Sequence, residues 1–122
     1  MRNNFEVIQQ SLDLAETLQS GIEYIRTGFA QGRFEEMLPM LQDVTKAFIS
    51  IQQALAGRKA DMTSRFLNDH TLKIQNGLTQ LVSAYEMMDW DQARKAMEYE
   101  VIPGFLQWKE EIERHYRPAV VS

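Results

Sequence analysis

The chain has 122 residues, of which 44% are hydrophobic and 25% charged, and its formal net charge at pH 7 is −4. This length predicts one domain, residues 1–122, built around a single core. The acidic balance and the scattered lysines and arginines argue against nucleic acid as a main partner. Without cysteine the chain forms no disulfide and offers no thiolate ligand or nucleophile. No apolar run reaches the roughly 20 residues of a membrane span, and the amino terminus does not resemble a signal peptide. We therefore expect a cytoplasmic protein without a membrane partner.

The first half of the chain predicts two helices joined by a short turn. The first helix begins at an asparagine cap near the amino terminus and stops at Gly32. The second runs from about Phe34 to Gly57. A connection this short forces antiparallel neighbours, so residues 4–57 form a helical hairpin. The inner stripes recur every three or four residues and consist of Phe5, Ile8, Leu12, Ala15, Leu18, Ile22, Ile25 and Phe29, then Met37, Leu41, Val44, Phe48, Ile51 and Leu55.

The second half predicts another hairpin, over residues 61–116. Its first helix starts between Asp61 and Ser64, and its second starts after Asp89. The tail from Arg117, which contains a proline, is expected to fray. The stripe of the third helix consists of Leu67, Thr71, Ile74, Leu78, Leu81, Tyr85 and Met88, and that of the fourth consists of Ala93, Met97, Val101, Phe105, Trp108 and Ile112.

The fourth helix has the clearest start and an expected bend. The Asp89 side chain can accept a hydrogen bond from the first turn, and Gln92 can reach back to the Asp89 N–H, which would make a capping box. Pro103 has no N–H for the Tyr99 carbonyl, and its ring crowds the preceding turn, so we expect a kink at this position. The fold class is therefore all-α, an antiparallel up-down-up-down four-helix bundle whose last helix is kinked.

The two hairpins resemble each other under a shift of 56 positions. The shift places one aromatic residue on another on each side of both turns, and one glycine on another within the helices. The paired positions are Gly21 with Gly77, Phe29 with Tyr85, and Phe34 with Trp90. Duplication of one hairpin explains these pairs, and so does the common apolar pattern of any two hairpins.

Catalytic and metal-binding patterns are weak. A di-iron bundle needs a Glu three residues before each ligating His, and neither His70 nor His115 has one. Glu111 and His115 are four residues apart, which favours a solvated pair over a metal site. We find no phosphate-binding glycine loop and no nucleophile with an adjacent base. The chain is therefore expected to be no enzyme and to hold no cofactor or metal, although inward-facing carboxylates in a metal- or small-molecule-binding bundle are an alternative.

Methionine and aromatic residues point to partner binding. Several of the seven methionines fall near the hairpin turns, and methionine suits both core filling and surfaces that accept varied apolar shapes. Beside the expected kink, Tyr99, Pro103, Phe105 and Trp108 could line a groove for an amphipathic helix of a partner. The same four residues could instead be buried in the monomer or in a homodimer interface.

The segment Asp89–Ile112 resembles small uncharacterised helical proteins of Gram-positive bacteria. The resemblance consists of an acidic cap with an aromatic, a Glu-Tyr-Glu, a proline and a tryptophan, and it implies no known activity. In size, acidity and helix arrangement the chain is also similar to bacterial flagellar export chaperones, which hold the helical ends of secreted subunits. We therefore expect a non-enzymatic bundle that acts through protein–protein contacts, as a chaperone or adaptor. A structural homo-oligomer is a further alternative.

Overall fold

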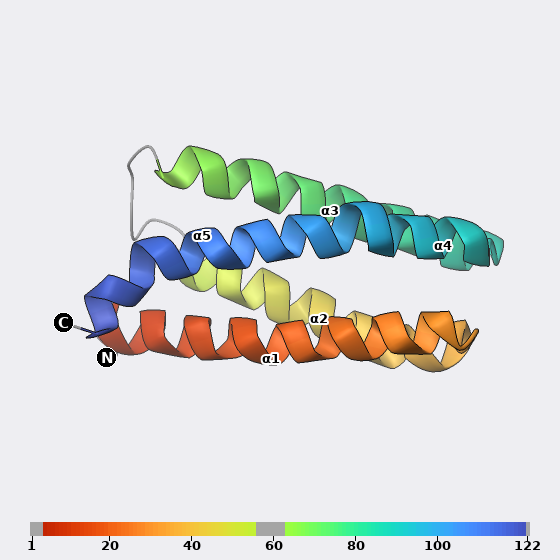
Figure 1. Cartoon of the computed structure of the whole chain (residues 1–122), viewed down its shortest axis with the longest axis horizontal. Helices are drawn as coiled ribbons and strands as arrows, with labels where there is room; N and C mark the ends of the chain where they lie inside the picture. The colour runs from red at the N-terminus through yellow and green to blue at the C-terminus, as the bar shows by residue number, and fades with distance from the viewer. Residues whose placement is uncertain (1–3, 56–62, 122) are drawn as a thin grey trace.

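The structure, a computed structural model, describes the backbone of residues 4–55 and 63–121 and side chains within 6–55 and 69–114. Its elements are α1 (Asn4–Ala30), α2 (Phe34–Leu55), α3 (Thr63–Met87), α4 (Trp90–Ala96), the π-helical turn η1 (Met97–Val101) and α5 (Ile102–Val121). Since α4, η1 and α5 follow one another without a break, the described residues form four antiparallel rods (Figure 1). The predicted all-α four-helix bundle is confirmed.

The rods do not pack evenly around the bundle. Helix α1 packs along α2 and α5, and α3 packs along α4, η1 and α5. In Figure 1, α5 lies in front of the space between α1 and α3, and α2 lies behind it. No similarly close packing joins α2 to α3 within the described residues. One side of the bundle is therefore less tightly closed than the others.

The core contains the predicted stripes almost in full. Every stripe residue of α1 from Ile8 onward and of α4, η1 and α5 is buried. Leu55, Leu78 and Tyr85 are only partly buried, and Met88 is 63% exposed, so its assignment to the stripe was wrong. The side chains of Phe5 and Leu67, and Gly57 as a whole, lie outside the described residues.

The carboxyl end of α5 differs from prediction, and the irregularity expected at Pro103 takes the form of a π-helical turn that precedes it. Helix α5 continues to Val121, so the expected fraying from Arg117 is not seen; Pro118 removes only one backbone donor in the final turns. The helix also stays continuous through Pro103, and the irregularity precedes it as η1. The Ile102 N–H donates to the Met97 carbonyl, five residues back, in place of the usual four. This wider turn accommodates a proline that cannot donate to the Tyr99 carbonyl.

Both hairpin turns have the same backbone geometry. Gly32 has φ of 75° and Met88 has φ of 53°, and in each turn the following N–H donates over 2.8 Å to a carbonyl five residues back. This hydrogen bond and the left-handed residue are features of the Schellman motif that ends many helices. The two turns are 56 residues apart, the shift that relates the two hairpins in the sequence.

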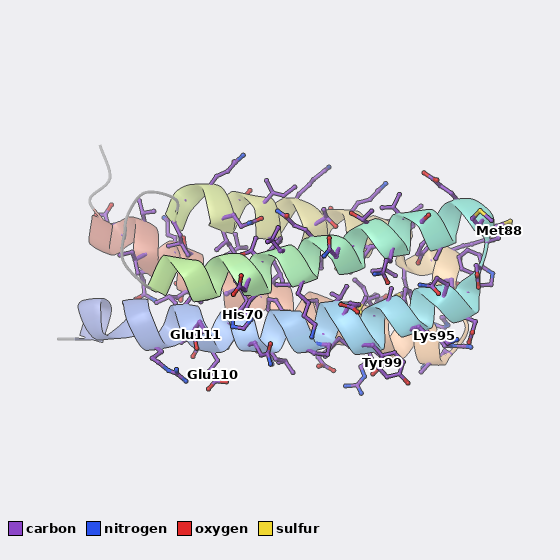
Figure 2. The ribbon with its side chains drawn as sticks, turned by 90° about the horizontal axis from the view of Figure 1, so that it is seen from above. His70, Met88, Lys95, Tyr99, Glu110 and Glu111 are labelled. Carbon is purple, nitrogen blue, oxygen red and sulfur yellow. The ribbon has the colours of Figure 1, made fainter. Side chains whose placement is uncertain are left out.

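The Met88→Gly variant is expected to be more stable than the wild type. A non-glycine residue in the left-handed region carries a steric cost of roughly 1–2 kcal/mol. Met88 lies at the end of the bundle and its side chain is 63% exposed, so its loss removes little packing (Figure 2). Because glycine also gains freedom in the unfolded chain, we expect a net gain of about 0.5–1 kcal/mol in the free energy of unfolding. Urea denaturation measures it, and a loss of stability would contradict the strained geometry.

The predicted cap on the fourth helix is half right. The Asp89 side chain accepts a hydrogen bond from the Gln92 backbone N–H over 3.1 Å, as predicted. The Asp89 N–H does not donate to the Gln92 side-chain oxygen, as a capping box requires, because it donates to the Ala84 carbonyl in the turn. The Schellman hydrogen bond thus replaces the second half of the capping box.

Four aromatic side chains join the two hairpins at the end of the bundle that carries both turns. Phe34 stacks on Trp90, with ring centroids 5.0 Å apart, and Phe29 lies 4.8 Å from Phe34. Tyr85 meets Trp90 edge-on at 5.2 Å. Arg94 lies over the Phe34 ring, 5.1 Å from its centroid, and adds a cation–π contact. The aromatic residues flanking the turns thus hold one hairpin against the other.

Candidate functional site

An apolar groove runs between α2 and α3, on the less tightly closed side of the bundle. It has a volume of about 520 Å³, and its exposed lining is mostly apolar. Two helices whose backbones stay apart leave their facing side chains partly uncovered, which produces a groove of this kind. The lining residues are Leu38, Leu41, Gln42, Thr45 and Lys46 from α2 and Val82, Tyr85 and Glu86 from α3.

The walls of the groove expose aliphatic side chains to solvent. Leu38 is 38% exposed on α2 and Val82 is 55% exposed on α3, whereas Leu41 is buried and forms part of the floor. Ile49, which is 45% exposed, shares the face of α2 that carries Leu38 and Gln42, so the apolar surface continues along that helix. An exposed branched aliphatic residue on each wall is typical of surfaces that receive another apolar element.

Two opposite charges flank this apolar surface. Lys46 belongs to α2 and Glu86 to α3, and both line the groove. Neither forms an ion pair with another described residue. Because both sit at the solvent edge, each remains hydrated and available to an incoming partner of opposite charge.

Tyr85 links the groove to the aromatic cluster. Its hydroxyl donates a hydrogen bond of 2.6 Å to the Phe34 carbonyl, and burial raises the pKa of Tyr85 to about 12. The ring lines the groove on one side and meets Phe29 and Trp90 on the other. The groove end nearest the turns therefore has a fixed wall, held by a hydrogen bond between the two hairpins.

Removing the Tyr85 hydroxyl is expected to weaken the bundle in a pH-dependent way. At neutral pH the Tyr85→Phe variant should lose about 0.5–1.5 kcal/mol, the usual net contribution of one hydrogen bond. The folded-state pKa of about 12 lies above the ordinary value of 10.0, so the unfolded chain loses this proton first. The stabilisation is therefore complete below pH 10 and declines as the pH rises toward 12. Urea denaturation from pH 7 to 11 should show the two proteins converging; a constant difference would contradict this assignment.

The four residues predicted to bind a partner do not share one surface. Phe105 and Trp108 are 1% and 2% exposed and belong to the core, whereas Tyr99 is 70% exposed on η1. Figure 2 shows Tyr99 on the outer side of the last rod, and Pro103 is only partly exposed. The predicted groove beside Pro103 thus lacks two of its four residues, because the stripe that carries Phe105 and Trp108 faces α1, α2 and α3. Partner binding through Tyr99 stays a prediction.

The methionines near the turns also fall into a buried group and an exposed group. Met37 and Met97 are 3% and 1% exposed and fill the core, and Met40 is partly buried against it. Met87 and Met88 are 78% and 63% exposed beside the second turn. Core filling and surface exposure therefore both occur among the methionines near the turns.

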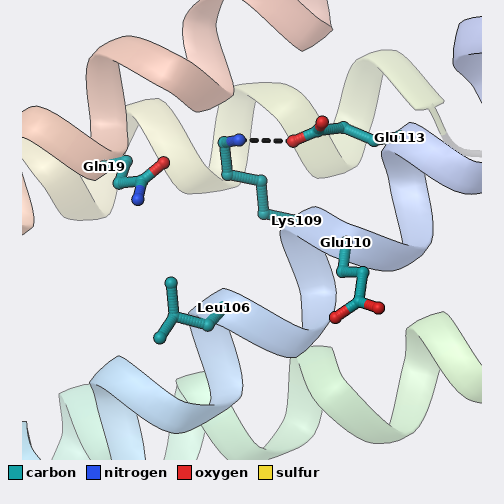
Figure 3. Close-up of a pocket in the computed structure, with 5 residues that line it drawn as sticks. All are labelled: Gln19, Leu106, Lys109, Glu110 and Glu113. Atoms are coloured by element: carbon teal, nitrogen blue, oxygen red, sulfur yellow. Dashed lines mark hydrogen bonds and ion pairs between the residues drawn. The ribbon is translucent and has the colours of Figure 1, made fainter.

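A smaller pocket lies between α1 and α5. It measures about 190 Å³ and is lined by Gln19, Leu106, Lys109, Glu110 and Glu113. In Figure 3, Lys109 and Glu113 form an ion pair one helical turn apart, and Glu110 points away from them. The ammonium of Lys109 is thus already neutralised by a neighbour on its own helix.

The described histidine and carboxylate side chains do not form a metal site. Within the described side chains, no three His, Asp or Glu residues come together in a group that could hold a metal ion. His70 is on α3 and Glu111 on α5, toward the end of the bundle away from Met88 (Figure 2). The side chain of His115 lies outside the described residues, so the Glu111–His115 pair is not placed.

Comparison with known proteins places the chain in a family. A family model described as Domain of unknown function (DUF8042) matches residues 6–111. The chain belongs to this family. The DUF8042 match runs from α1 into α5 and includes every residue that lines the α2–α3 groove. A search of curated proteins and a search of solved structures found no significant match. Among the described helices of this DUF8042 domain, none combines the length and the apolar character needed to cross a membrane.

Proposed function

We propose that this DUF8042 protein is a non-enzymatic helical bundle that acts through protein–protein contacts and receives a partner in the α2–α3 groove. The observation that supports the proposal is the exposure of Leu38 and Val82 on the two walls of this apolar groove, with Ile49 exposed further along the same face of α2. A partner that covers these side chains removes apolar surface from water, at roughly 25 cal/mol per Å². The proposal includes a cytoplasmic location and a bacterial chaperone or adaptor role, in keeping with the similarity in size, acidity and helix arrangement to bacterial flagellar export chaperones.

The groove supports this role better than catalysis. Its polar groups are one amide, two hydroxyls and two separated charges. Both hydroxyls already donate to backbone carbonyls, that of Thr45 to Leu41 over 2.8 Å and that of Tyr85 to Phe34 over 2.6 Å. An active site brings a nucleophile or a general base within hydrogen-bond reach of a partner group. Affinity for an apolar partner requires only shape and apolar area, which the groove supplies.

The experiment compares two exposed aliphatic residues, one in the groove and one outside it. Val82→Asp places a charge on the groove wall, and Leu106→Asp places the same charge on the exposed side of α5, where the wild-type residue is 46% exposed. Both proteins should keep the thermal stability of the wild type within a few degrees, since neither site is buried.

Each protein is then used as bait in extracts of its own cells, followed by mass spectrometry. We expect a partner that the wild type and Leu106→Asp retain and that Val82→Asp loses. Charging the centre of an apolar contact typically weakens binding at least tenfold. Equal recovery by all three baits would remove the groove from the proposal. A purified wild type whose mass by light scattering doubles with concentration would favour the homo-oligomer instead.

A further inference from the structure

Glu86 and Lys46, the two charged residues of the groove, lie at different positions along its length. The hydrogen bond from Tyr85 to the Phe34 carbonyl sets the end of α3 level with the start of α2. Glu86 follows Tyr85 directly, and Lys46 is twelve residues along α2 from Phe34 (46 − 34). At 1.5 Å per helical residue, the two side chains are roughly 18 Å apart along the groove axis. This distance corresponds to about three turns of a helix lying in the groove.

The concave shape of this surface favours a different partner over a second copy. Two copies related by a two-fold axis through the groove would place groove against groove and leave the space between them unfilled. The four described rods of each copy are already packed in its own bundle, so none is free to fill the groove of another. A single convex helix from another protein fits between α2 and α3 and covers the apolar residues of both walls.

We infer that the groove receives one amphipathic helix whose apolar face covers Leu38 and Val82. Its edge toward α3 carries a basic residue beside Glu86, and its edge toward α2 carries an acidic residue beside Lys46, about twelve residues away. Twelve residues span about 18 Å and differ by about 120° around the helix axis, so the two charges fall on the two edges of the apolar face. This inference rests on the proposed function and adds the chemistry of the partner. The helix can dock in either direction, because reversing it exchanges only the order of the two charges.

The test uses synthetic helical peptides of about 20 residues with leucine at every third or fourth position. Three versions carry Lys and Glu, Lys and Lys, or Glu and Glu at two positions twelve residues apart, one on each edge of the apolar face. Each is labelled and titrated with the wild type, with Lys46→Glu and with Val82→Asp, and binding is followed by fluorescence polarisation at low salt. Lys46 is exposed, so circular dichroism of Lys46→Glu should match that of the wild type.

The wild type should bind the Lys/Glu peptide about three- to tenfold more tightly than either like-charged peptide, with the difference shrinking as salt is added. In Lys46→Glu both groove charges are acidic, so the Lys/Lys peptide should become the tightest. The same order of affinities on both proteins would overturn the charge pattern while leaving the apolar groove intact. Failure of all three peptides to bind the wild type, or equal binding to Val82→Asp, would overturn the groove as a helix-binding site.

Discussion

Replacing Trp108 by alanine is expected to lower the free energy of unfolding by about 3–5 kcal/mol, the usual cost of removing a large aromatic side chain from a core. Trp108 is 2% exposed, meets Phe48 edge-on at 5.0 Å and lies 5.7 Å from Phe105. Neighbouring helices cannot collapse fully into the space that an indole leaves. The variant therefore loses both apolar burial and its aromatic contacts, and urea denaturation of the purified protein measures the total.

The matched control is Tyr99→Ala, an aromatic deletion at an exposed position of the same rod. Tyr99 is 70% exposed, so we expect its loss to change the free energy of unfolding by less than about 0.5 kcal/mol. Together the two variants distinguish an aromatic residue buried in the core of the monomer from one exposed on its surface, the alternatives that the sequence leaves open. If both variants changed the free energy of unfolding by similarly small amounts, Trp108 would have to be exposed. The predicted partner-binding groove beside Pro103 would then be supported again.

The helices and their buried faces could be predicted because their physical cause is local and repeated. Apolar residues at every third or fourth position indicate one buried face without any knowledge of the neighbours. Ile25, Phe48 and Ile112, from three different helices, are each at most 1% exposed, as this reasoning predicts. The turn at Gly32 was also predictable, because only glycine adopts a left-handed conformation without cost.

The groove could not be predicted because it depends on how closely two particular helices approach. Leu38, Ile49 and Val82 lie off the inner stripes, and an apolar residue off the stripe is common on protein surfaces. That these residues lie on facing helices becomes clear only once α2 and α3 are placed in space. The sequence signal that could have found part of it is the four-to-seven-residue spacing of Leu38, Gln42 and Ile49, which follows one helix face.

Met88 was misplaced for a related reason. Its spacing from Tyr85 continues the stripe of α3, and a periodic pattern contains no information on where the helix ends. The end is decided by the Schellman turn, whose hydrogen bond from Asp89 to Ala84 requires a left-handed residue at Met88. The same hydrogen bond explains why the predicted capping box is incomplete. The Asp89 N–H donates to the Ala84 carbonyl and is therefore not available to the Gln92 side chain.

The similarity of the two hairpins extends to the way their helices approach. Gly21 allows Val44 of α2 close to α1, and Gly77 allows Val101 of η1 close to α3. A Cβ added at Gly21 would lie 2.9 Å from Val44 Cγ2, and one at Gly77 would lie 2.7 Å from Val101 Cγ2. The shift of 56 positions relates Gly21 to Gly77 and Val44 to Glu100, whose Cβ would lie 2.9 Å from a Cβ added at Gly77; Val101 is one position further. The shift therefore relates a close approach at a glycine as well as a turn, which is what a duplicated hairpin would preserve.

The surroundings of Gly21 and Gly77 differ, so a larger side chain at these two positions should lower the free energy of unfolding by different amounts. At Gly77 the added Cβ would also meet the Glu100 Cβ at 2.9 Å and the Val101 backbone nitrogen at 3.1 Å, whereas at Gly21 the nearby atoms belong only to side chains. Side chains can rotate away, but the backbone of η1 can yield only by moving the whole rod. Gly77→Val is therefore expected to destabilise the protein by about 1–3 kcal/mol, and Gly21→Val by less.

Denaturation of both variants, together with Val101→Ala and the Gly77→Val/Val101→Ala double variant, makes this comparison quantitative. Truncating Val101 removes the nearest obstructing atom, so the double variant should cost less than the sum of the two single changes. Strictly additive costs would mean that the new side chain does not meet Val101. A Gly77→Val protein as stable as the wild type would mean that α3 and η1 do not approach each other this closely, and the similarity between the two hairpins would then be confined to their turns.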